Sequence, residues 1–264
     1  MVKIKPVVDV PLLLVEGELK VLVAADLHIG LEHDLWLGGA SVPSQTEKLF
    51  SRLRSHLKKI GPDRLVLLGD IKHNVPLTSF QEKNEVPAFI EGLSALVEVD
   101  LVPGNHDVGL KDLVPSDMKI APSAGYILDG VGYFHGHAWP HPDLFRADAL
   151  VSSHIHPALR LRDPLGSSAP RRVWVRTPLR GDAVREHYRR DLVVPEMIIV
   201  PSFNPLCGGY PLDVAGKDER GPLLKMADLD RARIYLLDGT GLGRLGRIRK
   251  AHGNRKRLYS AKEK

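Results

Sequence analysis

The sequence predicts an α/β protein in which two packed, mixed β-sheets are flanked by helices. In the first half of the chain, short apolar segments alternate with segments of helical periodicity, which is typical of strands joined by helices. In the second half, strand-like segments follow one another with few helices between them, which indicates a second sheet packed on the first. The 264 residues are 43% hydrophobic and 26% charged, a composition that excludes disordered and collagen-like chains.

The first half begins with a predicted hairpin and continues with two helices, each followed by a buried strand. The hairpin arms flank Glu-Gly-Glu, and the apolar second arm indicates a buried strand. The first helix ends at Gly61-Pro62, and Pro87 predicts a kink or break in the second helix. The predicted ranges, in chain order, are Leu12–Val15, Leu19–Ala25, the helix Ser44–Ile60, Arg64–Leu68, the helix 79–98, and Val99–Val102.

The second half is predicted to be mainly β-structure, with one charged helix near Arg180–Arg190. Asp129-Gly130 lies between two short apolar segments and predicts a tight hairpin. The predicted strands are Tyr126–Leu128, Val131–Phe134, Ala149–Ser152, Val173–Val175, Met197–Val200 and Arg233–Leu237. Because no internal repeat or low-complexity linker interrupts the pattern, we interpret residues 1–242 as a single domain, followed by a basic tail over 243–264.

The net charge of +5 is located mainly in this C-terminal tail. Residues 243–264 contain nine lysines and arginines against one acidic residue, Glu263. A second basic stretch, the Arg-rich segment 160–190, contains nine arginines. A basic arm commonly adds sequence-independent attraction to phosphate backbones, but a solvated tail that only improves solubility is an equal alternative.

Other features of the sequence restrict the location of the protein. No apolar run approaches the roughly 20 residues that a membrane span needs, and the N-terminal segment lacks the pattern of a signal peptide. The single cysteine, Cys207, excludes an internal disulfide framework and a cysteine-rich zinc module. We therefore expect a cytoplasmic protein without a membrane partner, and Cys207 is interpreted as a small buried residue.

Polar side chains follow five of the predicted strands, where each strand ends. They are Asp26 and His28, Asp70, Asn105-His106-Asp107, His135 and His137, and His154 and His156. Open α/β sheets build their sites at these carboxyl ends. Each fragment alone is weak evidence, because a lone Asp-x-His is most often a surface turn. Burying so many ionisable groups together would cost several kcal/mol for each uncompensated charge, so the full set predicts bound cations.

The types of ligand narrow the choice of metal. Aspartate, histidine and asparagine without thiolate suit Mn, Fe, Zn, Co or Ni, rather than calcium or a closed structural zinc site. There are too many candidate ligands for one ion. They fit two ions about 3.5–4 Å apart that share a carboxylate, a geometry suited to in-line attack at phosphorus.

In this order, the motifs Asp-x-His, Gly-Asp, Gly-Asn-His-Asp, His and Ser-His-x-His resemble those of the calcineurin-like metallophosphoesterase superfamily. The resemblance spans residues 26–156 and implies a four-layer αββα sandwich. It implies that the first metal is held by Asp26, His28 and His156, that Asp70 bridges both metals, and that the second is held by Asn105, His135 and His154. It also implies that His106 lies beside the scissile phosphate as a charge stabiliser or proton donor, and that a metal-bound hydroxide attacks.

Finer motifs resemble one branch, the ligase-associated metallophosphoesterases of bacteria and their archaeal relatives. The motifs are DLHIGLE (26–32), GDIKH (69–73), HGHAWP (135–140), SHIHP (153–157) and PSFNPLCGG (201–209). This closer resemblance implies a manganese-preferring DNA endonuclease for single-stranded or distorted DNA. A role in DNA repair with a helicase or ligase partner rests on the family analogy alone.

Two positions depart from the superfamily pattern. His73 stands where many relatives have a second aspartate that orients the catalytic histidine. Its imidazole could hydrogen-bond to His106 or bind metal, but it supplies no negative charge. Ser153 replaces a glycine, so we expect a small local adjustment of the turn. Besides His73, the further candidates for supporting or substrate-contacting residues are Asp107, Glu32 and His137, with a surface salt bridge as the alternative for Glu32 and solvent exposure as that for His137.

Three functions remain open at the level of sequence. The leading hypothesis is the two-metal nuclease, for which Trp139 and Trp174 could each offer one face for base stacking. The second is a small-molecule phosphoesterase acting on cyclic nucleotides or phosphomonoesters, which would not need the basic tail. The third is a non-catalytic nucleic-acid-binding protein with a degenerate metal site, which absence of metal uptake would favour.

Overall fold

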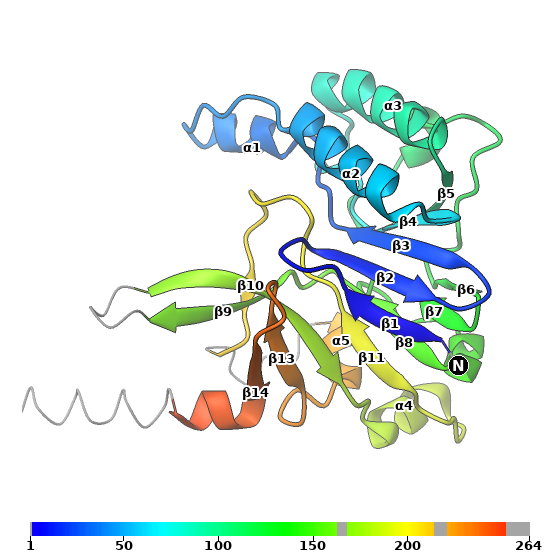
Figure 1. Ribbon diagram of the computed structural model, residues 1–264, viewed down its shortest axis with the longest axis vertical. Helices are drawn as coiled ribbons and strands as arrows, with labels where there is room; N and C mark the ends of the chain where they lie inside the picture. Colours follow the sequence, from blue (N-terminus) through cyan, green and yellow to red (C-terminus); the bar gives the residue numbers. More distant parts are fainter. Residues whose placement is uncertain (1, 163–167, 214–220, 252–264) are drawn as a thin grey trace, which may run out of the picture.

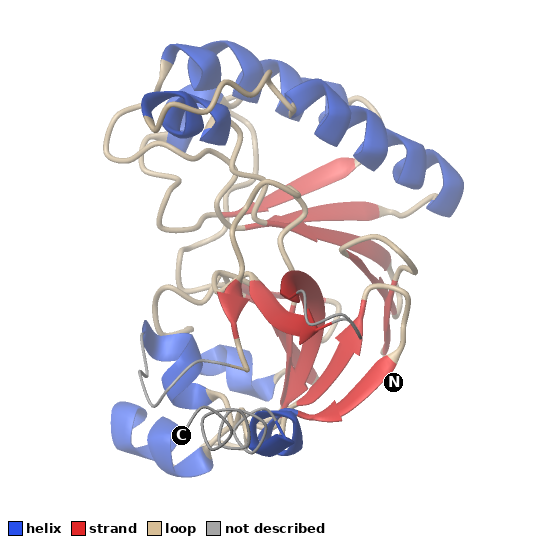
Figure 2. Cartoon of the chain, turned by 90° about the vertical axis from the view of Figure 1, so that its left-hand side faces the viewer, coloured by secondary structure: helices blue, strands red, loops and turns tan. Residues whose placement is uncertain are grey.

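The computed structural model describes residues 2–162, 168–213 and 221–251. Two β-sheets lie face to face, with helices on both outer sides (Figures 1 and 2). The helices α2 (Thr46–Ile60) and α3 (Phe80–Ser94) cover the first sheet, with the short helix α1 (Leu31–Leu37) beside them, and α4 (Gly181–Tyr188) and α5 (Gly221–Met226) cover the second. The predicted fold class, two mixed sheets flanked by helices, is confirmed.

The first sheet has the strand order β1-β2-β3-β4-β5. Its strands are β1 (Lys3–Pro6), β2 (Leu12–Glu16), β3 (Lys20–Ala25), β4 (Arg64–Leu68) and β5 (Glu98–Val102). β3, β4 and β5 are parallel, and Leu68 pairs with Ala25 on one side and with Val102 on the other. The carboxyl ends of these three strands therefore lie level at one edge of the sheet.

The second sheet has the order β12-β9-β10-β11-β8-β7-β6, with β13 and β14 attached to β10. Its strands are β6 (Tyr126–Leu128), β7 (Val131–Tyr133), β8 (Ala149–Ser152), β9 (Pro157–Arg162), β10 (Ser168–Thr177), β11 (Glu196–Ile199), β12 (Tyr210–Pro211), β13 (Arg233–Leu236) and β14 (Gly241–Arg244). β7, β8 and β11 are parallel. The first half of β10 pairs with β9 in a hairpin that projects from the body of the molecule (Figure 1).

Three apolar layers hold these four layers of secondary structure together. Alternate residues of β3 serve two of them, because Leu22 packs with the leucines of α2 and Val23 packs between the sheets. Trp174 of β10 is also buried between the sheets. Its neighbour Val173 lies in the third layer, between the second sheet and the helices α4 and α5. Burial on both faces explains why the sequences of these strands are almost continuously apolar.

The helix ends follow local sequence signals. α2 ends at Gly61, whose φ of 59° is in the left-handed region. α3 begins at Ser79, which forms a reciprocal capping box with Glu82, and the helix continues through Pro87 to Ser94. The turn Asp129-Gly130 has positive φ at both residues, as a two-residue type I′ hairpin requires.

The C-terminal basic segment is partly built into the fold. β14 ends at Arg244, residues 245–251 are helical, and Leu245 is fully buried. Residues 252–264 of the tail and 163–167 of the Arg-rich segment lie outside the described residues. Within the described part, no helix is long and apolar enough to cross a membrane.

Candidate metal centre

The strand ends of both sheets converge on one group of side chains. Asp26 and His28 follow β3, Asp70 follows β4, His135 follows β7, and His154 and His156 follow β8. These residues form two overlapping clusters, in each of which the potential ligand atoms lie within 4.8 Å of one another. The clusters are Asp26, His28, Asp70 and His156, and Asp70, His135 and His154. Asp70 therefore belongs to both.

The backbone at these residues is held in an uncommon conformation. Five of them have positive φ: Asp26 (53°), His28 (44°), Asp70 (42°), His154 (70°) and His156 (43°). A left-handed conformation costs a residue with a side chain about 1 kcal/mol or more, and such residues gather at functional sites. The surrounding fold thus positions these side chains against a local backbone preference.

The imidazole nitrogens face the two aspartates. His135 Nε2 lies 3.1 Å from Asp26 Oδ1 and 3.4 Å from Asp70 Oδ2. His28 Nε2 is 3.6 Å from Asp70 Oδ2, and His156 Nε2 is 3.6 Å from Asp26 Oδ2. The two Nε2 atoms of His28 and His156 are themselves only 3.2 Å apart. Five carboxylate and imidazole side chains therefore direct their ligand atoms into a small volume.

The pKa values show how this concentration of charge is balanced. Burial opposes protonation of His156, but the negative charge of Asp26 raises its pKa to about 9. The pKa of His135 is likewise raised, against the effect of burial, by its hydrogen bond with Asp26 and by the charge of Asp70. Burial lowers the pKa of His28 to about 2. Without metal, the two carboxylates thus favour the charged forms of His135 and His156, whereas burial favours the neutral form of His28.

The donor set fits divalent metal ions. Asp26 is fully buried, and its Oδ2 atom has no hydrogen-bond partner, which is costly for a carboxylate unless a cation satisfies it. Carboxylate and imidazole are suitable ligands for Mn, Fe, Zn, Co and Ni. Asn105, the remaining ligand implied by the sequence, is exposed in the loop after β5.

Hydrogen bonds behind the histidines fix their orientation. His156 Nδ1–H donates to the carbonyl oxygen of Gly208 at 3.0 Å, which leaves its Nε2 lone pair for a metal. His73 Nε2 is 3.0 Å from Asp34 Oδ2, and His73 Nδ1 is 3.0 Å from His28 Nδ1. Asp34 was not identified from the sequence, because its role depends on a contact between separate segments.

His73 affects the catalytic candidate His106 through its backbone. His106 Nδ1 donates to the carbonyl oxygen of His73, while the two rings stack with centroids 5.2 Å apart. The backbone N–H of His106 donates to Asp70 Oδ1 at 2.9 Å. The imidazole of His73 therefore contacts His28 and Asp34 instead of hydrogen-bonding to His106, and among the described residues none hydrogen-bonds to His106 Nε2.

Asp107 connects the loops that follow β4 and β5. Its carboxylate accepts hydrogen bonds from the backbone N–H groups of Ile71, Lys72 and Gly104 at 2.9, 3.1 and 2.8 Å. Burial and the neighbouring charge of Asp70 raise the pKa of Asp107 to about 6 despite these donors. Asp107 thus fixes the loop that carries Asp70 relative to the loop that carries His106.

Two buried glutamates have a similar supporting function. Glu32 accepts from the backbone N–H of Gln45 at 2.7 Å and is buried, so it does not form a surface salt bridge. Glu82, which we did not identify from the sequence, accepts from the backbone N–H groups of His73, Asn74 and Ser79 at 2.6–2.8 Å. Burial opposes ionisation of Glu82, but these donors hold its pKa below the usual value. The Ser-x-x-Glu capping motif was the available sequence signal.

Two further predicted features have clear positions. His137 Nδ1 lies 3.0 Å from His135 Nδ1, and burial together with the charge of His135 lowers the pKa of His137 to about 4. Ser153 is buried, and its hydroxyl donates to the carbonyl oxygen of Leu68 in the other sheet at 3.0 Å. The left-handed residues of this turn are His154 and His156, so serine at 153 needs no unusual backbone conformation.

Glycine is required where a backbone passes close to the cluster. A Cβ atom at Gly69 would lie 2.0 Å from the His135 ring, and one at Gly104 would lie 2.1 Å from Asp70 Oδ1.

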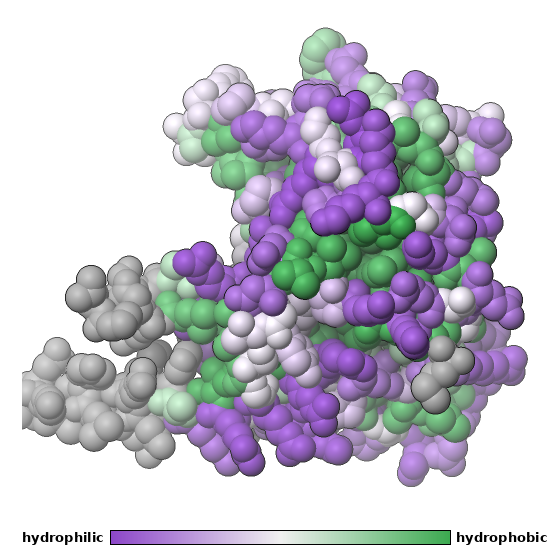
Figure 3. All heavy atoms as spheres, in the orientation of Figure 1, coloured by the Kyte–Doolittle hydropathy of each residue, from purple (hydrophilic) through white to green (hydrophobic). Residues whose placement is uncertain are grey.

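An apolar cavity lies elsewhere in the molecule. It is lined by Ile4, Val8 and Leu237, among others, and contains none of the clustered residues. On the face shown in Figure 3, hydrophobic residues gather over β1 and β2, where this cavity lies. The residues that can bind metal therefore lie at the strand ends and not in this cavity.

The chain is similar to known proteins in its family and in its fold. The family described as calcineurin-like phosphoesterase matches residues 19–169. The crystal structure of Pseudomonas putida nuclease MPE is similar, with a TM-score of 0.50 and 19% identity over 89% of this chain and 98% of that chain. Yfce, a phosphoesterase from E. coli, has a TM-score of 0.37 and 17% identity over 84% and 96% of the two chains. No curated protein sequence matches.

Proposed function

Since the chain belongs to the calcineurin-like phosphoesterase family, whose metal-dependent chemistry its buried His/Asp site suits, we propose that it is a two-metal nuclease that hydrolyses DNA phosphodiester bonds. The observation that carries the proposal is the position of Asp70 in both clusters of potential ligands. One carboxylate shared by two ions is the arrangement that suits in-line displacement at phosphorus. The proposed native ion is manganese, in keeping with the ligase-associated branch that the motifs resemble.

In this proposal, Asp26, His28 and His156 hold the first ion, and His135, His154 and Asn105 hold the second. When bound, the ions would neutralise charge on the phosphate and lower the pKa of water. His106 acts beside the scissile phosphate, because its backbone N–H is tied to Asp70 and its Nδ1 to His73. Its free Nε2 is then available to protonate the leaving oxygen or to stabilise its charge.

The position and charge of the β9–β10 hairpin support the proposal of a polyanionic substrate. β9 begins at Pro157, directly after His156, so the hairpin starts at the metal centre and projects beyond it (Figure 1). Arg160 and Arg171 are exposed on this hairpin. Guanidinium groups on a hairpin that starts at a phosphoesterase centre would attract a nucleic-acid backbone without reading its sequence. The structural likeness to Pseudomonas putida nuclease MPE is compatible with this substrate.

Base stacking on tryptophan receives no support. Trp174 is buried between the sheets, and one face of Trp139 is covered by His187, with ring centroids 3.8 Å apart and planes at 6°. Because neither tryptophan offers a free platform for a base on these faces, a small-molecule phosphoesterase remains the second candidate. Binding of DNA would have to rely on phosphate contacts, which suits endonucleolytic cleavage of single-stranded or distorted DNA in repair, with a helicase or ligase as partner.

The test is cleavage of a circular single-stranded DNA with manganese, run beside a chromogenic phosphodiester and a phosphomonoester. We expect linear products that the Asp70→Ala variant does not form. Turnover of only the small esters would replace the nuclease proposal by the second candidate. Absence of all turnover together with absence of metal uptake would favour the non-catalytic binding protein.

A further inference from the structure

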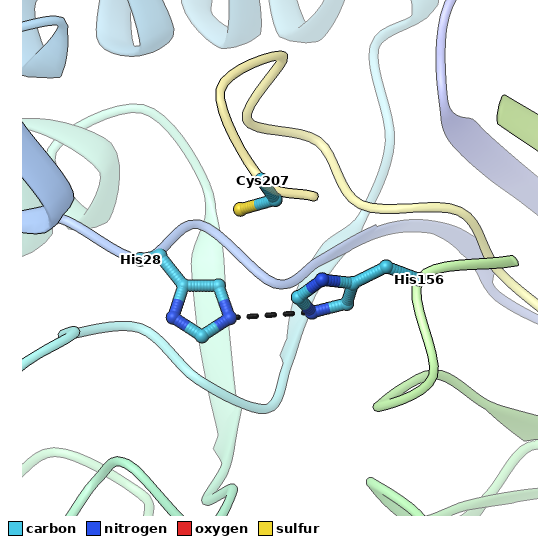
Figure 4. A group of neighbouring side chains, drawn as sticks. All are labelled: His28, His156 and Cys207. Carbon is cyan, nitrogen blue, oxygen red and sulfur yellow. Dashed lines mark hydrogen bonds between the residues drawn. The ribbon is translucent and has the colours of Figure 1, made fainter. Parts of the chain in front are cut away.

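The thiol of Cys207 lies beside the first of the two ligand clusters. Cys207 Sγ and the imidazole nitrogens of His28 and His156 form a third group whose potential ligand atoms lie within 4.8 Å of one another. Figure 4 shows the thiol on its loop beside the rings of His28 and His156, whose Nε2 atoms are joined by the dashed line. Two ligands of one tetrahedral zinc ion are about 3.5 Å apart, so ligand atoms that all lie within 4.8 Å of one another could surround one ion after a small adjustment.

The loop 201–209 is fastened to the metal centre at several points. Asn204 Nδ2 donates to the carbonyl oxygen of Leu27 at 2.8 Å, and the N–H of Cys207 donates to the carbonyl oxygen of Asn204 at 3.3 Å. The next residue, Gly208, accepts the Nδ1–H of His156. Because the same loop orients one imidazole ligand, the position of the thiol is linked to that of the cluster.

A second observation points to a ligand at this position. Asp26 is fully buried, and its Oδ2 atom has no hydrogen-bond partner. The cluster that contains Asp26 shares His28 and His156 with the group that contains Cys207. A cation that satisfies this oxygen would therefore lie among the two imidazoles and within reach of the sulfur.

We propose that Cys207 is a thiolate ligand of the ion held by Asp26, His28 and His156, and that it makes this position bind thiophilic ions more tightly than the second position does, where manganese remains the proposed ion. This inference rests on the metal centre of the proposed function. On binding, the S–H bond breaks, a sulfur–metal bond forms, and the proton passes to solvent. Within the part of the chain that the structure describes, the second position, with Asp70, His135 and His154, has no cysteine ligand. The two positions should therefore differ in selectivity, with zinc, cobalt or cadmium favoured in the first.

Cobalt(II) titration of the full-length protein in thiol-free buffer tests this directly. Cys207 is the only cysteine of the chain, so a sulfur-to-cobalt charge-transfer band in the near ultraviolet can arise from no other thiolate. We expect this band with the wild type. Cys207→Ser should lose it while keeping the visible cobalt absorption from the nitrogen and oxygen ligands. Equilibrium dialysis should show a cadmium affinity about tenfold or more lower in Cys207→Ser, with little change for manganese.

The His154→Ala variant is the matched control, because it removes a ligand of the second position only. It should bind less cobalt and retain the charge-transfer band. Cobalt binding with visible absorption but without the band, or a band that persists in Cys207→Ser, would overturn the role of Cys207 and leave the metal centre intact. Absence of any cobalt binding would overturn both this inference and the proposed function.

Discussion

The Nδ1 atoms of His73 and His28 lie 3.0 Å apart, and His73 Nε2 lies 3.0 Å from Asp34. A carboxylate can only accept a hydrogen bond, so His73 donates to it through Nε2–H. A neutral His73 then accepts at Nδ1 from His28 Nδ1–H, and the lone pair of His28 is left on Nε2, which faces the cluster. The chain Asp34–His73–His28 thus selects the metal-binding tautomer of His28.

His73→Ala should therefore weaken metal binding at the first position. Loss of such a supporting hydrogen bond typically reduces metal affinity by about 10–100-fold, so activity should recover at higher metal concentration. Isothermal titration and activity as a function of metal concentration measure this effect. His33→Ala, in the exposed part of α1, is the control and should resemble the wild type. A loss of activity that saturating metal does not restore would contradict this role.

The sequence was sufficient to predict the elements on which the centre is built. β3, β4, β5 and β8 are apolar because they are buried between layers, and the polar residues that follow them mark the strand ends. Other elements have only weak signals in the sequence. β1 is an exposed edge strand with lysines and Pro6, and α1 has only seven residues and leaves Trp36 and Leu37 more than 60% exposed. Neither shows an apolar periodicity.

Residues that support the centre were harder to identify, because they act across separate segments. Asp34 reaches His73 across 39 positions, and Cys207 lies beside Asp26 across 181 positions. No local pattern records such contacts. Glu82 is different, since Ser79 three residues earlier forms a recognisable capping box. Its second function, holding the backbone of His73 and Asn74, appears only in the folded structure.

Glu82→Ala should destabilise the protein and disturb the loop that carries His73. It would leave three backbone N–H groups without their acceptor, at a cost of about 2–4 kcal/mol in the free energy of unfolding. Urea unfolding measures this change. Glu91→Ala, at an exposed position of the same helix, should change stability by less than about 0.5 kcal/mol. Equal effects of the two substitutions would contradict the buried acceptor role of Glu82.

His106→Ala should separate catalysis from metal binding. The side chain of His106 hydrogen-bonds to a carbonyl oxygen, and its backbone N–H, which the substitution keeps, donates to Asp70. We expect the metal content of the wild type and a kcat lower by about 10²–10⁴-fold. Atomic absorption and steady-state kinetics on the chromogenic phosphodiester measure the two quantities. Normal kcat would exclude the proposed role in charge or proton transfer.

Removal of metal should make stability depend on pH. The pKa of His156 is about 9 in the folded chain, against an ordinary 6.5, because Asp26 favours its charged form. The resulting stabilisation is complete below pH 6.5, declines as the pH rises, and is lost above pH 9, a change of about 2–3 kcal/mol. Urea unfolding of chelator-treated protein at pH 6.5 and 9 should show it. The metal-loaded protein and the metal-free His156→Gln variant should both have flatter profiles; equal slopes in all three would contradict this account.

The arginines of the β9–β10 hairpin should contribute to DNA binding without affecting chemistry at the metals. Arg160 and Arg171 are exposed and lie on a hairpin that starts one residue after His156. If both contact phosphates, Arg160→Ala combined with Arg171→Ala should reduce the slope of log affinity against log salt by about 0.7 for each arginine on single-stranded DNA. Fluorescence anisotropy with a labelled oligonucleotide at several salt concentrations measures the slope. Arg176→Ala is the matched control, because Arg176 lies near the other end of β10 and pairs with Glu196. An unchanged salt slope in the double variant would place the DNA path elsewhere, and an equal loss of turnover on the chromogenic phosphodiester would indicate damage to the metal centre instead.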